Sequence, residues 1–460
     1  METTFPPAGR HFDGRVLFLS QDADVVQRQL AGDYLTLEQA MPLRDGASLE
    51  QIAPAGSLKR GVFAVAVAGQ RCGQCASRDA APYAELLAGI GLVIARSFDP
   101  GYRRNCHNLG VLTSTDFGLV ERIRNGEAIP LAEFTRGEDP VTAQVIRSGG
   151  LFAFTRARMT DESVAAAPAG HRPMTYAEKI LSRSRAGRRS PVRPGDTLLA
   201  RADWRHADRD LSPIAQRLLE LEIGPELKLH DPKTIVRGGT DDSRVEPGQL
   251  VIVNGSHAPR CGALGALAFP VGAIDMVCAW MSGEVRVTVP PTCRVRLDAE
   301  LPPRVAARDI VTHLLALPYL REGLAAGQVI EYSGEALLAL PASERTVLIQ
   351  MAVAIGAFCG IVAPDAGTLA LLRERHGPAM ALDPWMRSDP DAEFAHTIVV
   401  DCSALASGRQ VPVDERRHFG GERPAHRMGP PGDHLQPGIG QQAGEALSDR
   451  HRTDRVGVAP

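Results

Sequence analysis

The clearest structural signal in this sequence is PGQLVIVNGSH at residues 247–257, followed by CGALGALA at residues 261–268. Four consecutive apolar residues at 250–253 predict a buried strand, because turn-forming residues stand on both sides of them. Ser256 and His257 follow the end of this strand. Such a pair serves either as a structural cap with a hydrogen-bonded histidine or as reactive groups, and the residues alone leave both roles open.

Around this stretch, residues 174–405 alternate between longer helical patterns and short apolar runs. The periodicity predicts strands at 250–253 and 285–289, and helical segments at 213–222, 306–317 and 343–355. Residues 262–282 form one further segment with a glycine-rich opening. The pattern is typical of an α/β unit.

The first 155 residues show a similar but more compact alternation. Buried strands are predicted at 15–19, 61–67 and 92–95, and helices at 79–90 and 117–125. We therefore expect a small α/β domain at 1–155, a linker at 156–173 and a second α/β region at 174–405.

The last segment, residues 406–460, is rich in Arg, His, Gly, Pro and Gln and poor in side chains to bury. Such a composition does not offset the entropy of ordering the chain, so we expect a disordered tail. A basic interaction arm is an alternative interpretation. A shifted reading frame is another, because the composition changes abruptly.

A glycine turn with polar residues stands at 73–79, which reads GQCASRD. If it opens a helix, the first-turn N–H groups and the Arg78 guanidinium suit a carboxylate ligand. The alternative is that Ser77 is an ordinary N-cap and Arg78 is solvated.

The order of the motifs resembles that of the aconitase/isopropylmalate dehydratase superfamily. The swivel domain of that family has a G-x-G-S-S-R-E turn, a strand ending in V-I-A-x-S-F and an N-x-x-x-x-G segment. The corresponding stretches here are GQCASRD at 73–79, GLVIARSF at 91–98 and NCHNLGVL at 105–112. The family's large subunit has M-T-x-A-E-K-I-L, V-x-P-G-D, P-G-x-L-V-I-G-A-D-S-H-T and Y-G-A-L-G-A. These resemble MTYAEKIL at 174–181, VRPGD at 192–196, and the two stretches at 247–257 and 261–268.

This resemblance implies an α/β fold in which a swivel-like β/α domain precedes a partial, cluster-domain-like α/β/α region. It also exposes departures at reactive positions. Ala76 stands at the family's proton-abstracting serine, Gly255 at the Asp of D-S-H, and Ala354 at an active-site Glu. The D-H-x-x-P segment is missing between His206 and Pro247. Alanine and glycine side chains cannot transfer protons.

The eight cysteines bear on the cofactor that the family implies. A [4Fe–4S] cluster is expected from the resemblance, held by cysteines of an S-C-T-N segment and a C-x-x-C pair, but no cysteine follows Cys402. Cys402 falls at a leucine position of the family. Cys72 and Cys75 form a C-x-x-C, which we interpret as coincidence, with a redox pair or half a metal site as alternatives. No residue is assigned as a metal ligand, and the scattered cysteines are expected to be buried thiols.

Composition limits the partners and the location of the chain. Its net charge is −3 from 51 basic and 54 acidic residues, and 44% of its residues are hydrophobic. We expect a small-molecule or protein partner, with no nucleic acid and no membrane. The sequence has no signal-peptide pattern at its start and no apolar run long enough to span a bilayer, which favours a cytoplasmic location.

The function implied by the resemblance is that of an aconitase-type hydro-lyase or isomerase. Its substrate would be a small hydroxy-polycarboxylate such as isopropylmalate, citrate or a phosphono analogue. Ser256 and His257 would act catalytically near the substrate hydroxyl, and Ser77 and Arg78 would bind a carboxylate. The alternative is a non-catalytic or truncated homologue that at most binds a polycarboxylate. A third possibility is a chain that pairs with a second subunit supplying the cluster ligands.

Overall fold

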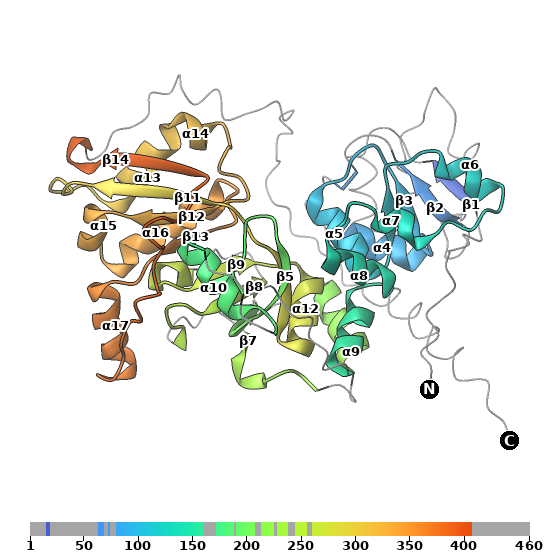
Figure 1. Ribbon diagram of the computed structural model, residues 1–460, viewed down its shortest axis with the longest axis horizontal. Helices are drawn as coiled ribbons and strands as arrows, with labels where there is room; N and C mark the ends of the chain where they lie inside the picture. The colour runs from blue at the N-terminus through green and yellow to red at the C-terminus, as the bar shows by residue number, and fades with distance from the viewer. Residues whose placement is uncertain are drawn as a thin grey trace, which may run out of the picture. The chain divides into compact units, whose positions relative to one another are not determined.

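The computed structural model (Figure 1) describes only part of the chain. The described residues are 15–18, 63–68, 72–73, 80–160, 172–187, 190–207, 213–224, 228–237, 244–254 and 260–406. We refer to residues 15–160 as the N-terminal region and to residues 172–406 as the second region.

The N-terminal region contains a four-stranded parallel sheet in the order β1-β2-β3-β4. The strands are β1 (Arg15–Phe18), β2 (Phe63–Val67), β3 (Leu92–Ile94) and β4 (Leu112–Ser114). The helices are α4 (Ala80–Ala88), α5 (Pro100–Leu109), α6 (Leu119–Arg124), α7 (Leu131–Thr135), α8 (Pro140–Arg147) and α9 (Leu151–Thr160). The predicted strands at 15–19, 61–67 and 92–95 are confirmed as β1, β2 and β3. All three residues of β3 are buried, as expected for an apolar run in a parallel sheet.

The second region contains two four-stranded parallel sheets and a two-stranded antiparallel ribbon. The orders are β13-β12-β11-β14, β7-β6-β8-β9 and β10-β5. The strands are β5 (Thr197–Arg201), β6 (Trp204–Ala207), β7 (Ile235–Arg237), β8 (Leu250–Asn254), β9 (Leu267–Pro270), β10 (Glu284–Thr288), β11 (Thr292–Asp298), β12 (Val329–Ser333), β13 (Cys359–Val362) and β14 (His396–Asp401). The predicted α/β class, with a swivel-type region ahead of a second α/β region, is confirmed.

Helices and short helical turns connect these strands. The α-helices are α10 (Tyr176–Ser184), α11 (Pro213–Leu218), α12 (Ala273–Ser282), α13 (Ala307–Ala316), α14 (Pro318–Arg321), α15 (Glu335–Ala339), α16 (Ala342–Ala354) and α17 (Ala366–His376). The shorter turns are η1 (Leu219–Ile223), η2 (Pro232–Thr234), η4 (Arg260–Leu264) and η5 (Cys402–Ala404). The stretch 262–282, taken from the sequence as one segment, divides into η4, β9 and α12, because Gly265 at φ +87° turns the chain between η4 and β9.

Strand β8 and helix α12 lie at the centre of the largest hydrophobic core. The apolar run of β8 is buried from Leu250 to Val253, and α12 buries every residue except its last. Apart from Asp275 and the terminal Ser282, this helix is apolar on all sides, so it packs inside the domain. Trp280 is fully enclosed there.

Two further observations concern the expected domain layout. Helix α9 runs without a break across position 156, where the linker was expected to begin. None of the helices within the described ranges is both long enough and apolar enough to cross a membrane.

Candidate functional site

The four residues predicted to act on a substrate, Ser77, Arg78, Ser256 and His257, lie outside the described residues, so their roles stay predictions. The structure instead describes the residues that flank them. On either side of Ser77 and Arg78, the chain is described up to Gly73 and again from Ala80. On either side of Ser256 and His257, the chain is described up to Asn254 and again from Arg260.

The first flank is a glycine turn held against α5. Cys72 forms a β-bridge with Phe98, and Gly73 follows at φ +98°. A Cβ atom on Gly73 would lie 2.3 Å from the Cβ of Tyr102 in α5. Only glycine tolerates both the positive φ and this close approach, which explains the glycine at the start of the turn that leads to Ser77.

The second flank ends beside a cavity of about 580 Å³. The Asn254 side chain donates a hydrogen bond of 2.9 Å to the carbonyl of Val271. Val271 lines this cavity together with Arg104, Asp275 and other residues of α5, β10 and α12. The strand end that leads to Ser256 is therefore tied to the wall of a cavity that both regions line.

A buried polar cluster, formed by Arg104, Asn108, Asp275 and Arg286, connects α5 to α12 and β10. Arg104 donates to both carboxylate oxygens of Asp275, with Nε–Oδ2 at 3.1 Å and Nη2–Oδ1 at 2.8 Å. Arg286 donates from Nη2 to the Asn108 side-chain oxygen at 2.8 Å and from Nη1 to the Thr142 hydroxyl at 3.0 Å. The cluster joins side chains of both regions into one hydrogen-bonded unit.

Electrostatically, this cluster carries two cations and one anion. Burial, reinforced by the neighbouring charge of Arg104, lowers the pKa of Arg286 to about 10. Arg286 therefore stays protonated at neutral pH, and its charge exceeds what Asp275 alone can balance. A wall of this kind favours an anionic ligand in the adjoining cavity.

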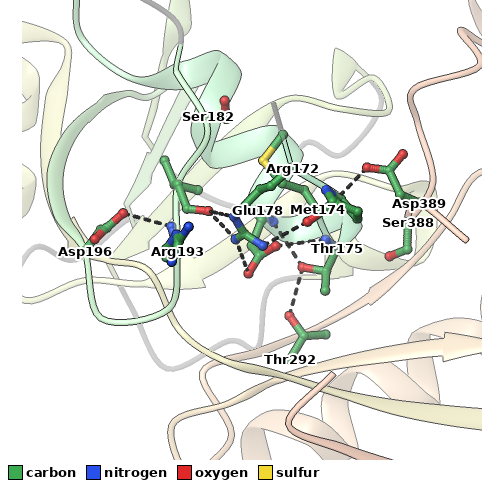
Figure 2. A network of polar contacts seen from close by, with 12 residues as sticks. Arg172, Met174, Thr175, Glu178, Ser182, Arg193, Asp196, Thr292, Ser388 and Asp389 are labelled. Atoms are coloured by element: carbon green, nitrogen blue, oxygen red, sulfur yellow. Dashed lines mark hydrogen bonds and ion pairs between the residues drawn. The ribbon is translucent and has the colours of Figure 1, made fainter. Parts of the chain in front are cut away.

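The motif at 174–181 has a structural role (Figure 2). Thr175 caps α10, and the Glu178 carboxylate accepts a hydrogen bond from the Thr175 N–H at 2.9 Å, which completes a capping box. Arg172 pairs with the same carboxylate at 2.9 Å, and the Thr175 hydroxyl contacts that of Thr292 at 3.1 Å. The motif therefore docks the start of α10 onto β11.

A second set of contacts extends this network to a buried acid. Ser388 accepts from the Tyr176 N–H at 2.7 Å and donates to Glu331 on β12 at 2.6 Å. Burial raises the pKa of Glu331 above its usual range. The Tyr176 hydroxyl donates to the Gly265 carbonyl at 2.6 Å, so the network also reaches the loop after η4.

A second cleft, of about 480 Å³, lies between η4, α16 and α17. Gln350 on α16 lines it, one helical turn before Ala354, which ends the helix with an exposed side chain. Arg260, the first described residue after His257, lines it as well. The described residues on the two sides of Ser256 and His257 therefore differ, because Asn254 is hydrogen-bonded to a lining residue of the first cavity and Arg260 lines the second cleft.

The described cysteines bear on the cluster that the family implies. Seven are described, and each is a buried free thiol. Burial raises the pKa of Cys293 and of Cys402 to about 11, which disfavours the thiolate that iron requires. Across the described ranges, no group of three or more His, Cys, Asp or Glu side chains could hold a metal ion. The described residues do not fit a [4Fe–4S] cluster.

The sequence interpretation missed the cluster of Arg104, Asp275 and Arg286. One signal was available, because Asp275 stands alone among uncharged residues in VGAIDMVCAWM at 271–281. A lone acid on a buried helix needs a buried partner.

The fold and these cavities define an α/β protein with parallel sheets, in which a swivel-type region precedes a larger α/β region. The profile of the aconitase family (aconitate hydratase) matches residues 223–415, and that of the aconitase C-terminal domain matches residues 49–115. The chain belongs to the aconitase family. The C-terminal domain of that family here precedes the aconitase domain, as the resemblance predicted.

Two curated relatives are similar to half of the chain. The protein named "Probable 3-isopropylmalate dehydratase large subunit" of Methanosarcina mazei is 33% identical over 275 residues, covering 50% of this chain and 64% of that protein. The 3-isopropylmalate dehydratase large subunit 1 of Methanopyrus kandleri is 30% identical over 274 residues, covering 50% and 63%. The chain thus spans less than two thirds of these relatives.

A solved 3-isopropylmalate dehydratase structure from Methanocaldococcus jannaschii matches 33% of this chain and 93% of its own. The identity is 21% and the TM-score is 0.22, which is too low to support the fold.

Proposed function

We propose that this chain is an aconitase-type hydro-lyase or isomerase that acts on a small hydroxy-polycarboxylate such as isopropylmalate, citrate or a phosphono analogue. The observation that carries the proposal is the match of two aconitase profiles, one to each region of the chain. The cavity of about 580 Å³ supports it, because residues of both regions line that cavity and its wall carries excess positive charge. A pocket of this size suits a small ligand.

In this proposal, the residues outside the described ranges carry the chemistry. Ser77 and Arg78 bind one carboxylate of the substrate, and Ser256 and His257 lie next to its hydroxyl. His257 is the residue able to move a proton near neutral pH. Arg78 supplies a planar two-point contact to the carboxylate.

We further propose that a second subunit supplies the cysteine loop. The described cysteines do not fit a cluster, and no cysteine follows Cys402. A bound cluster would supply a Lewis acid for the substrate hydroxyl. The competing proposal, a non-catalytic homologue that only binds a polycarboxylate, is favoured by the non-reactive residues at 76, 255 and 354.

Anaerobic iron–sulfur reconstitution distinguishes the enzyme completed by a second subunit from the non-catalytic homologue. We expect the chain alone to show no visible cluster absorbance, and a mixture with a subunit carrying S-C-T-N and C-x-x-C to dehydrate citrate or isopropylmalate. His257→Asn should abolish that turnover, while Arg308→Gln, on the exposed face of α13, should leave it unchanged. A cluster-loaded mixture that turns over none of these acids would establish the non-catalytic alternative.

A further inference from the structure

We propose that Glu85 on α4 and Tyr102 on α5 form a pH-sensitive latch in the N-terminal region. With its proton, Glu85 holds α4 closed against α5, and loss of that proton in mildly alkaline solution lets α4 open locally. The two helices lie side by side (Figure 1). The latch consists of described residues only, and it is independent of the proposed function.

Glu85 occupies a core position of its helix. Ala81, Glu85 and Ala88 follow the helical spacing that places side chains on one face, and all three are buried. The two alanines belong to a small apolar cluster that also contains Tyr102 and Cys106 of α5. Only 1% of Glu85 is exposed, so its carboxyl group lies among apolar groups away from water. Such surroundings strongly disfavour the charged form of a carboxyl group.

The contacts of Glu85 include no positive charge. Both carboxyl oxygens accept a hydrogen bond from the Tyr102 hydroxyl, at 2.7 and 2.8 Å. The other titratable side chains around this pair are the thiols of Cys106 on α5 and of Cys72 before the glycine turn. Tyrosine and cysteine side chains are neutral or negative at any pH, so neither kind balances a carboxylate.

The basic residues of α5 do not balance it either, because each of them has another partner. The pairs are Arg103 with Glu138, Arg104 with Asp275, and His107 with Thr113. Among the described residues, Glu85 therefore has no cation to compensate a negative charge while α4 is closed. The carboxylate regains hydration only when α4 moves away from α5.

Tyr102 also connects the latch to the glycine turn. Gly73 packs so closely on the Cβ of Tyr102 that no larger residue fits between them. Two backbone hydrogen bonds hold Cys72 beside α5, one from its N–H to the Ser97 carbonyl at 2.9 Å and one from the Asp99 N–H to its carbonyl at 2.7 Å. Asp99 caps α5 and accepts from the Tyr102 N–H at 3.1 Å. A displacement of Tyr102 is therefore transmitted directly to the Cys72–Gly73 segment.

The proton balance gives the direction and the size of the effect. Burial raises the pKa of Glu85 to about 8, whereas a carboxyl group that opening exposes to water returns to its ordinary pKa of 4.5. The closed form holds a proton that the open form releases, so the latch is most stable below pH 4.5 and weakens as the pH rises to 8. In this range the equilibrium constant for opening increases by about tenfold per pH unit, and it levels off above pH 8.

The opening is local because α4 buries little surface in this cluster. The helix has nine residues, and its contribution to the apolar cluster consists of Ala81 and Ala88. Detaching it exposes far less apolar surface than unfolding the sheet that carries β3. A segment of this kind opens at a lower free energy than the whole fold.

Hydrogen exchange of the full chain, followed by mass spectrometry between pH 6.5 and pH 9, tests the latch. Exchange rates are first corrected for the intrinsic pH dependence of amide exchange, which gives a protection factor for α4 and for β3. We expect the protection of α4 to fall by about 15-fold between pH 6.5 and pH 8 and to stay below that of β3 throughout. Glu85→Gln should keep the protection of α4 constant. Glu121→Gln, which removes an exposed acid of the same region, should match the native chain.

Tyr102→Phe gives a second test that does not require Glu85→Gln to fold. The Tyr102 hydroxyl lowers the pKa of Glu85 because it stabilises the carboxylate, so its removal should raise that pKa further. Between pH 8 and pH 9 the protection of α4 should then fall more than it does in the native chain, where we expect a change of about twofold at most.

Three outcomes would overturn the latch. The first is a constant protection of α4 from pH 6.5 to pH 8 in the native chain. The second is the same fall in Glu85→Gln as in the native chain, because the proton would then belong to another group. The third is equal protection of α4 and β3 at every pH, because the helix would then open only when the whole region unfolds.

Discussion

Arg104 and Asp275 form a two-point ion pair although 171 residues separate them in the chain. The carboxylate is almost fully buried, with 4% of the side chain exposed, while the guanidinium is 33% exposed. Asn108 lies at hydrogen-bond distance from the same carboxylate, 3.4 Å away. The pair therefore fixes how α5 of the N-terminal region meets α12 of the second region.

Replacing the buried partner of this pair should destabilise the protein. In Asp275→Asn the shape is kept but the charge is lost, which leaves Arg104 and Arg286 without their counter-ion. We expect the free energy of unfolding to fall by about 2–3 kcal/mol, less than for a fully buried pair because water screens Arg104. Urea denaturation measures it, with Glu121→Gln, which breaks the exposed pair with Arg124, as the control. Equal losses of unfolding free energy in both variants would show that the buried pair stabilises the fold no more than an exposed pair does.

A buried acid in the N-terminal region should make stability depend on pH. Glu85 accepts hydrogen bonds from the Tyr102 hydroxyl at 2.7 and 2.8 Å, and burial raises its pKa to about 8. The folded state thus holds a proton that the unfolded state releases from about pH 4.5 upward. Stability is full below pH 4.5 and is lost as the pH rises to 8, by up to about 1.4 kcal/mol per pH unit.

Glu85→Gln should remove this dependence. Urea denaturation at intervals between pH 6.5 and pH 8, above the range in which His107 contributes, should give a falling free energy for the native chain and a flatter curve for the variant. Glu121→Gln again serves as the control, since Glu121 is exposed. Parallel curves for native and Glu85→Gln would mean that Glu85 ionises normally in the folded state.

His107 should make the stability of the fold depend on pH in the opposite direction to Glu85. Its Nε2 atom lies 2.9 Å from the Thr113 hydroxyl, and burial together with the charge of Arg103 lowers its pKa to about 3. The folded state therefore excludes a proton that the unfolded state binds below its ordinary pKa of 6.5. Its contribution is full above pH 6.5 and is lost as the pH falls towards 3. In the Glu85→Gln background, where the opposing contribution of Glu85 is absent, His107→Gln should lessen the loss of stability between pH 6.5 and pH 4.5, as followed by circular dichroism. An unaltered acid limb would contradict this.

The sequence predicted the parts of the fold that follow from local pattern. The strands at 92–95 and 250–253 are unbroken apolar runs, and parallel sheets bury such runs on both faces. The stretch 262–282 was not divided correctly, because small residues such as Ala263 and Ala266 carry neither a helical nor a strand period. The first two of its three elements, η4 and β9, are separated by a backbone turn at Gly265, which only the structure shows.

The candidate site residues were predicted from the family resemblance and not from local sequence pattern. The resemblance pointed to Arg78 and His257, which lie outside the described residues, and these assignments stay predictions. The buried cluster around Asp275 could not be assembled from the sequence, because its members come from distant segments and surface charges are far more common than buried ones.

The glycine that ends α5 allows steric exclusion to be separated from backbone strain. Gly110 has φ +79°, and a Cβ atom there would lie 2.2 Å from the Gly149 carbonyl oxygen. Gly126 has nearly the same φ, +75°, but a Cβ atom there would meet nothing within 4 Å. Gly126→Ala should therefore lower the free energy of unfolding by about 1–2 kcal/mol through strain alone, and Gly110→Ala by about 2–5 kcal/mol because overpacking adds to strain. Thermal and urea denaturation of both variants test this, and equal losses would show that α5 and the Gly149 turn separate without penalty.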